Sequence, residues 1–114
     1  MSLIYKILSS EAWAAARATG VFEGAPVDHA DGYIHFSTAE QAQETARRHF
    51  AGQTGLMLLS VETEALGEAL RWEPSRGGDL FPHLYTALPT SAVVRARDIA
   101  TGPDGAPDVA ALLP

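Results

Sequence analysis

The sequence contains no cysteine, which excludes several kinds of protein at once. Without thiols the chain can form no disulfide, no thiolate metal site and no cysteine nucleophile, so packing must hold the fold. It also lacks any apolar run near the roughly 20 residues that a membrane-spanning helix needs. Its first ten residues, MSLIYKILSS, show no signal-peptide cleavage pattern. We expect a cytoplasmic protein with no membrane partner.

Positive charge is scarce as well: 8 Lys and Arg stand against 14 Asp and Glu, for a net charge of −6. This balance disfavours broad contact with a phosphate backbone, so we expect no binding to duplex nucleic acid. It does not exclude one phosphorylated ligand, because a few local cations such as Arg71 and Arg76 can bind a single anion. A small-molecule or nucleotide ligand therefore stays open.

The common catalytic and metal-binding motifs are missing too. His29, His35, His49 and His83 form no HxH, HxxxH or HExxH spacing, so the sequence predicts no metal site. There is no GxGxxG, no Walker loop and no GxSxG elbow. Any enzymatic site must be built from other residues.

What is present fits one α+β domain, since 114 residues with 46% apolar content can build a single core. An alanine-rich stretch ending at Gly20 predicts a helix over 10–19. Ser37 and Glu40 fit a capping box and predict a second helix over 38–50. The apolar run 56–61 predicts a central strand. With it we expect a mostly antiparallel sheet of about six strands, the others within 3–8, 33–37, 69–73, 83–88 and 92–99.

Two further segments complete the organisation. Residues 21–32, VFEGAPVDHADG, hold two glycines and a proline and predict a structured loop. The domain should span 1–100, and 101–114 should be an irregular C-terminal tail over the surface that matters little to the fold. We expect a monomer or a small homo-oligomer.

The first segment with candidate chemistry is GYIHFST, residues 32–38. If it is extended, Tyr33, His35 and Ser37 share one face while the apolar residues between them take the other. His35, Ser37 and Thr38 would then stand at a helix start, a corner that suits an anion or a sugar hydroxyl. The alternative is a buried His35 bonded to a backbone carbonyl, with Ser37 only a cap.

The second segment is RWEPSRGGDLFPHLYT, residues 71–86. Glu73 ends a predicted strand, where a carboxylate can perform acid–base work or orient a ribose. Alternatively, it forms an ion pair with Arg71 or Arg76. His83 and Tyr85 share a strand face, so they can reach one bound group or belong to a buried network.

These segments carry a family resemblance. The residues IYKI near the start, the helix with Trp13, DGYIHFSTAEQ and RWEPSRGGDLFPHLYTALP closely resemble the short bacterial family known as domain of unknown function 952. The resemblance spans about residues 3–99 and implies a one-domain α+β protein. It implies no established activity.

That family is in turn similar to the ADP-ribosyltransferase fold, in particular to RNA 2′-phosphotransferases, which have an H-x-H-hydrophobic-Ser stretch. His35 and Ser37 match its second His and its Ser, while Tyr33 stands at its first His. In transferases of this fold a first-strand His or Arg contacts the dinucleotide and a later Glu orients the ribose. Lys6 and Glu73 loosely correspond to that first-strand residue and to that Glu, so the resemblance implies NAD as a cofactor. Lys6 departs from the pattern, because many relatives have His at this position.

Two hypotheses follow. In the first, the protein binds a nucleotide-like or ADP-ribose-like ligand in a polar cleft, as a transferase with His35 and Glu73 as catalytic residues. The ligand-binding residues would be Lys6, Ser37, Thr38, Arg71, Arg76, His83 and Tyr85. In the second, the protein is a non-catalytic interaction or accessory module whose polar residues form a satisfied internal network. The sequence leaves open whether the protein is an enzyme.

Overall fold

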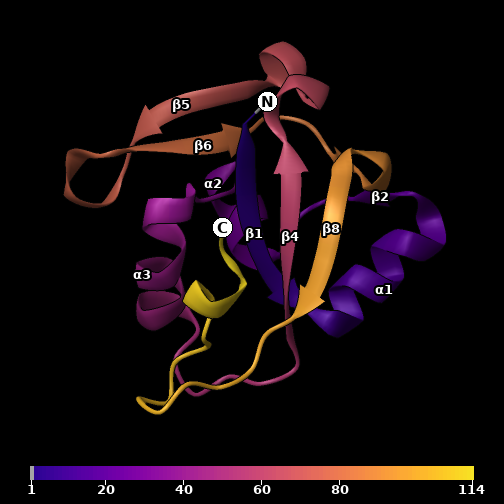
Figure 1. Ribbon diagram of the computed structural model, residues 1–114. Helices are drawn as coiled ribbons and strands as arrows, with labels where there is room; N and C mark the ends of the chain where they lie inside the picture. The colour runs from indigo at the N-terminus through magenta and orange to yellow at the C-terminus, as the bar shows by residue number, and fades with distance from the viewer. Residues whose placement is uncertain (1) are drawn as a thin grey trace.

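The central sheet has three antiparallel strands (Figure 1). The computed structural model describes residues 2–114, without the side chain of Arg76. β1 (Leu3–Ser9) pairs with β4 (Leu56–Glu62), and β4 pairs with β8 (Val93–Asp98), so the order is β1-β4-β8. Leu58, Leu59 and Val61 of β4 are all buried. The apolar run of 56–61 is thus the central strand, as predicted.

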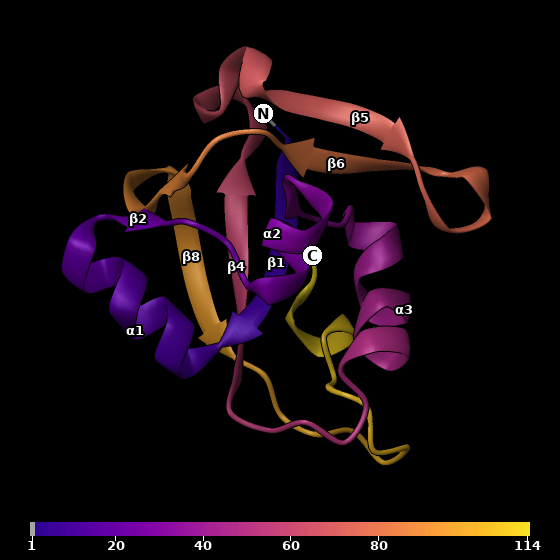
Figure 2. The same ribbon diagram turned by 180° about the vertical axis from the view of Figure 1, so that it is seen from behind.

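A second antiparallel sheet crosses near the start of β1 (Figures 1 and 2). Its order is β3 (Ile34–His35), β6 (Leu80–Leu84) and β5 (Leu70–Pro74). Tyr5 and Ser37 join the two sheets by exchanging backbone hydrogen bonds of 2.8 and 2.9 Å. Because of this bridge, β1 lies directly beside the segment that carries His35.

The strand count exceeds the prediction of about six. The short strands β2 (Val21–Phe22) and β7 (Leu88–Pro89) form a third, two-stranded sheet. The strand expected over 83–88 is instead β6, which ends at Leu84 and is followed by a bend before β7. The class is still α+β with antiparallel sheets, and the radius of gyration of 13.1 Å fits one compact domain of this length.

The first helix, α1 (Ser10–Thr19), agrees with its prediction. Ser9 caps it by accepting from the amide of Ala12 at 3.0 Å. Gly20 ends it at φ 93°, a left-handed angle that only glycine adopts without strain.

The second predicted helix, α3 (Ala39–His49), is confirmed, but its cap is not the predicted one. Thr38, not Ser37, accepts from the amide of Gln41, and the Gln41 side chain accepts from the amide of Thr38. Ser37 is used by the bridge to β1, so the helix begins one residue later. Tertiary pairing thereby overrides the local S-x-x-E pattern.

A third helix, α2 (Pro26–Asp31), lies inside the segment expected to be a loop. Pro26 occupies the first helical position, where a missing amide hydrogen costs nothing. The side chain of Asp28 accepts from the amide of Ala25 at 2.7 Å and fixes the helix start. Short 3-10 turns cover Thr63–Ala65, Gly67–Ala69, Arg76–Gly78, Thr90–Ala92 and Ala110–Leu112. Within residues 2–114 no helix has the length and apolarity needed to cross a membrane.

The side chains of β4 enter two hydrophobic clusters, one on each face of the central sheet. Leu59 lies in the cluster with Trp13 and Ala16 of α1. Leu58 lies in the cluster with Ala42 and Ala46 of α3. Period-two alternation therefore places neighbouring leucines on opposite faces.

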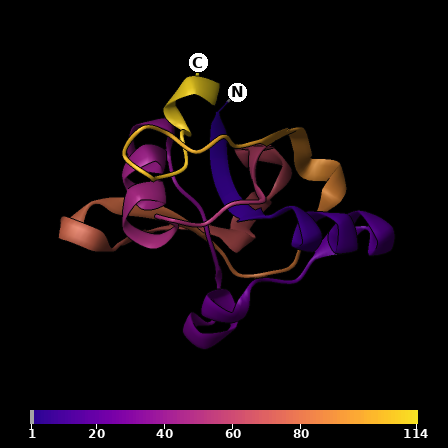
Figure 3. The ribbon, with the colours of Figure 1, turned by 90° about the horizontal axis from the view of Figure 1, so that it is seen from below.

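The C-terminal tail is irregular, but it is not the loosely attached surface segment that we expected. Val109 is 0% exposed and belongs to the cluster beneath α3. Gln43 of α3 donates to the carbonyl of Pro107 at 3.1 Å and accepts from the amide of Ala110 at 2.8 Å. Figure 3 shows the final turn beside α3. The tail is held there because Val109 is buried in this cluster and the partly buried side chains of Leu112 and Leu113 pack against it.

Candidate functional site

Two histidines face each other across the second sheet. His35 of β3 is the direct partner of His83 of β6, and their ring centroids lie 5.7 Å apart. The neighbours of His35 in the chain, Ile34 and Phe36, are buried in the core, as the expected alternation required. Tyr33 stacks on His83 with centroids 4.0 Å apart.

His35 is held by carboxylates from α2. Its Nδ1 lies 2.6 Å from Oδ1 of Asp28, and its backbone amide donates to the same oxygen at 3.1 Å. Its Nε2 lies 2.8 Å from Oδ2 of Asp31. Figure 2 shows α2 in front of β1, and the Nζ of Lys6 joins them by donating to both oxygens of Asp28 at 3.1 and 3.2 Å. The carboxylate of Asp28 therefore links α2 to β1 through Lys6 and to β3 through His35.

The Lys6–Asp28 pair is deeply buried, with the two side chains 6% and 2% exposed. Burial lowers the pKa of Lys6, and the Asp28 charge acts against that shift. Burial also raises the pKa of Asp28, but the hydrogen bond from His35 and the charge of Lys6 outweigh it, so the pKa falls well below its usual range. Lys6 and Asp28 therefore form a buried ion pair in which each charge neutralises the other.

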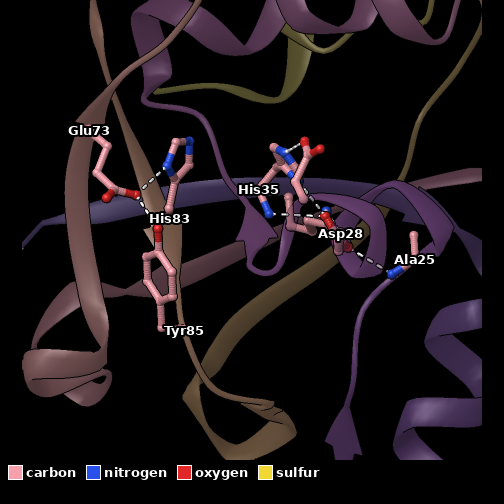
Figure 4. Close-up of polar contacts among 8 residues, drawn as sticks. Ala25, Asp28, His35, Glu73, His83 and Tyr85 are labelled. Atoms are coloured by element: carbon pink, nitrogen blue, oxygen red, sulfur yellow. Dashed lines mark hydrogen bonds and ion pairs between the residues drawn. The ribbon is translucent and has the colours of Figure 1, made fainter.

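Glu73 of β5 supports the second histidine. Its Oε1 lies 2.8 Å from Nδ1 of His83 and accepts from the Tyr85 hydroxyl at 2.7 Å. The hydrogen bonds from Tyr85 and His83 lower the pKa of Glu73, and the same carboxylate raises the pKa of Tyr85. In Figure 4, His83 and His35 stand between Glu73 on one side and Asp28 on the other.

A cavity of about 450 Å³ opens beside the histidines. Its walls come from β1, α2, β3, α3 and β6. Its polar lining consists of Lys6, Asp31, His35, Ser37, Thr45, His49, Ser75 and His83. The rest is mostly apolar and includes Tyr5, Ile7, Phe36, Phe50 and Phe81. The space therefore combines hydrogen-bonding groups with aromatic and aliphatic surface.

The predicted site residues fall into three groups. Lys6, His35, Ser37 and His83 line the cavity, while Glu73 and Tyr85 are joined to it through His83. Thr38 caps α3, and the Arg71 guanidinium lies 4.9 Å over the ring of Tyr85 rather than against Glu73. The side chain of Arg76, expected to bind an anion or to pair with Glu73, lies outside the described part of the structure.

Sequence reasoning missed Asp28 and Asp31. They stand three residues apart in the helix α2, so both lie on the face turned toward His35. The available signal was the pattern P-x-D-x-x-D-G, in which Pro begins a helix, Asp caps its first turn and Gly ends it. Within the described residues, no group of three or more His, Asp or Glu is arranged to hold a metal ion.

A smaller cavity of about 200 Å³ also borders Tyr33. It is lined by Glu23, Asp28, His29, Tyr85 and Thr86 among others. Its polar lining is mainly acidic and hydroxylic, so it differs in character from the histidine-lined cavity.

These features define a small single-domain α+β protein in which two carboxylate-supported histidines border a cavity near the junction of two antiparallel sheets. The family model described as "Protein of unknown function (DUF952)" matches residues 7–96. The chain belongs to this family, as its motifs indicated.

Solved structures resemble the chain over nearly its whole length. An X-ray crystal structure of protein CC0527 from Caulobacter crescentus has a TM-score of 0.95 and 56% identity and covers 97% of each chain. A solution NMR structure of CC0527 has a TM-score of 0.89 and 57% identity, covering 99% of this chain and 97% of that one. The comparison with curated proteins finds no match.

Proposed function

We propose that the protein binds a nucleotide-like ligand, of the size of a mononucleotide or an ADP-ribose fragment, in the histidine-lined cavity. One observation carries this proposal: His35 and His83 pair across two strands and line the same cavity, each fixed by a carboxylate. The volume of about 450 Å³ lies in the usual range for small-molecule sites, roughly 300–1,000 Å³. Imidazole rings can donate to phosphate and ribose oxygens.

The lining suggests how such a ligand would lie. His35, His83 and the hydroxyl of Ser75 offer hydrogen bonds to a phosphate or a sugar. Tyr5, Ile7 and Phe50 offer apolar surface to a base. This division between polar and apolar walls matches a nucleotide better than it matches inorganic phosphate.

Lys6 is poorly placed for the dinucleotide contact that the transferase resemblance implies. Both oxygens of Asp28 hold its ammonium group, so little of its charge is left for a dinucleotide. The buried pair instead supports the second hypothesis, a structural network, for this part of the polar set. The proposal therefore places ligand contacts at His35 and His83 and gives Lys6 no part in binding NAD.

Thermal melts with AMP, ADP-ribose, NAD, adenosine and inorganic phosphate test the proposal. A ligand at 100 times its dissociation constant should stabilise by about 2.7 kcal/mol, which raises the Tm of a domain this size by about 10 °C. His35→Gln and His83→Gln should each reduce that shift relative to their own unliganded melts. The control His29→Gln changes an exposed histidine that does not line this cavity and should keep the shift. Absence of any nucleotide shift, or full shifts in both variants, would contradict the proposal.

A further inference from the structure

The ring of His83 has one nitrogen, Nε2, that can interact with a bound ligand. His83 is 2% exposed and lines the cavity, and its Nδ1 is fixed by Glu73 at 2.8 Å. Among the described side chains, none forms a hydrogen bond with its Nε2. Figure 4 shows this nitrogen turned away from Glu73. With the proton on Nδ1, which the carboxylate favours, Nε2 carries a lone pair and can accept a proton.

The neighbouring ring of His35 is arranged for the opposite task. Its two nitrogens lie 2.6 Å from Asp28 and 2.8 Å from Asp31. A carboxylate only accepts hydrogen bonds, so the ring serves both contacts when each nitrogen carries a proton. Asp31 is 47% exposed and lines the cavity, so a ligand oxygen can take its place at Nε2. His35 can then donate a proton to that oxygen.

The geometry points to an acid–base pair for phosphodiester hydrolysis, with His83 as the base, His35 as the acid and a nucleoside 2′,3′-cyclic phosphate as the substrate class. This inference rests on the proposed nucleotide site. Hydrolysis of a cyclic phosphate requires that one oxygen lose a proton while another gains one. Two imidazoles 5.7 Å apart, one able to accept and one able to donate, meet that requirement within a single cavity.

The reaction balances without a further reactant. Nε2 of His83 takes a proton from water as the water oxygen forms a bond to phosphorus. The bond from phosphorus to one ribose oxygen breaks, and its electron pair stays on that oxygen. Nε2 of His35 supplies the proton that this oxygen needs. The product is a nucleoside monophosphate, and proton exchange with solvent restores both rings.

The net charge of the protein favours a small substrate over an RNA chain. The net charge of −6 opposes a polyanion, whereas one cyclic nucleotide brings a single negative charge. Glu73 and Tyr33 are positioning residues in this scheme: Glu73 fixes the tautomer of His83, and Tyr33 stacks on its ring at 4.0 Å.

Phosphorus NMR of the full chain with adenosine 2′,3′-cyclic phosphate tests the inference. We expect conversion to one adenosine monophosphate isomer. His83→Gln and His35→Gln should each lower kcat/KM by about 100-fold or more, the size of a general acid–base contribution. His29→Gln should leave it unchanged. Identical purification of all variants controls for contaminating nuclease.

The pH dependence separates chemistry from a structural effect. The wild type should show a bell-shaped profile of kcat/KM, because one ring must be neutral and the other protonated. Glu73→Gln removes the carboxylate that fixes the tautomer of His83, so kcat/KM should fall across the whole profile. If His83→Gln does not fold, Glu73→Gln alone carries this test.

The remaining outcomes of these experiments distinguish failure of the acid–base inference from failure of the binding proposal. If the cyclic nucleotide raises the Tm but is not hydrolysed, or if hydrolysis survives in both histidine variants, the acid–base inference is wrong and the binding proposal stands. If neither it nor any other nucleotide shifts the Tm, both are wrong.

Discussion

Asp28→Asn keeps the shape of a buried side chain while removing the charge that faces Lys6. The two side chains are 2% and 6% exposed, and the ammonium lies 3.1 and 3.2 Å from the two carboxylate oxygens. In the variant one of those oxygens becomes an amide nitrogen that cannot accept from Lys6. The positive charge is then buried without a counterion.

The expected loss of stability follows from this geometry. Removing one partner of a buried ion pair costs about 3–5 kcal/mol. A domain of this length has an unfolding entropy of about 0.24 kcal/mol/K, so the Tm should fall by about 12–20 °C. The double variant Lys6→Met with Asp28→Asn removes the stranded charge and should recover much of the loss. Thermal melts of the four proteins in the cycle give the coupling energy, which should be at least about 2 kcal/mol.

The pH dependence of the same melts has a definite sign. The pKa of Asp28 is depressed in the folded state, so its contribution to stability is fully present above the unfolded carboxyl pKa of about 3.9. It is lost as the pH falls from there through the folded pKa. The Tm of Asp28→Asn should therefore depend less on pH in that acidic window. A Tm within about 4 °C of the wild type at pH 7, or no recovery in the double variant, would refute the reasoning.

Two further predictions concern the cavity rim and the tail. Asp31→Ala should raise the affinity for AMP about two- to fivefold, as measured by isothermal titration calorimetry. The substitution removes an exposed carboxylate whose Oδ2 lies 2.8 Å from Nε2 of His35. Weaker binding would contradict the view that Asp31 competes with the ligand. Val109→Ala should cost about 2 kcal/mol, or about 8 °C in Tm, because Val109 is 0% exposed in the cluster beneath α3. Val94→Ala is the matched control at a residue 59% exposed and should change the stability by no more than about 0.5 kcal/mol. Equal melts for the two valine variants would restore the view of a dispensable tail.

The sequence predicted elements well where local pattern and tertiary packing agree. The unbroken apolar run of 56–61 required cover on both faces, and β4 has it. Helix α2 was missed because it has six residues and gains its stability from tertiary contacts of Asp28 rather than from an apolar face. The cap of α3 moved from Ser37 to Thr38 because a strand bridge competes for Ser37.

The arrangement of the candidate site could also be predicted only in part from the sequence. Alternation along a strand predicted that Tyr33 and His35 share a face and that His83 and Tyr85 share another. It could not predict that β3 and β6 are neighbours, since strand order depends on the whole chain. The partner of Lys6 was equally hidden, because Asp28 lies 22 residues away in the sequence. Only the fold brings these groups together.

The polar residues of the candidate site differ in burial, so the two hypotheses make different predictions for different residues. The ion pair between Lys6 and Asp28 is buried, so substitutions there should appear mainly as lost stability. Glu73 is partly exposed and contacts both Tyr85 and His83, and His83 lines the cavity, so the proposed function predicts that substitutions there reduce binding or turnover. His35 belongs to both groups, through Asp28 on one nitrogen and the cavity rim on the other. We therefore expect substitutions of His35 to lower both the stability of the fold and the proposed ligand binding.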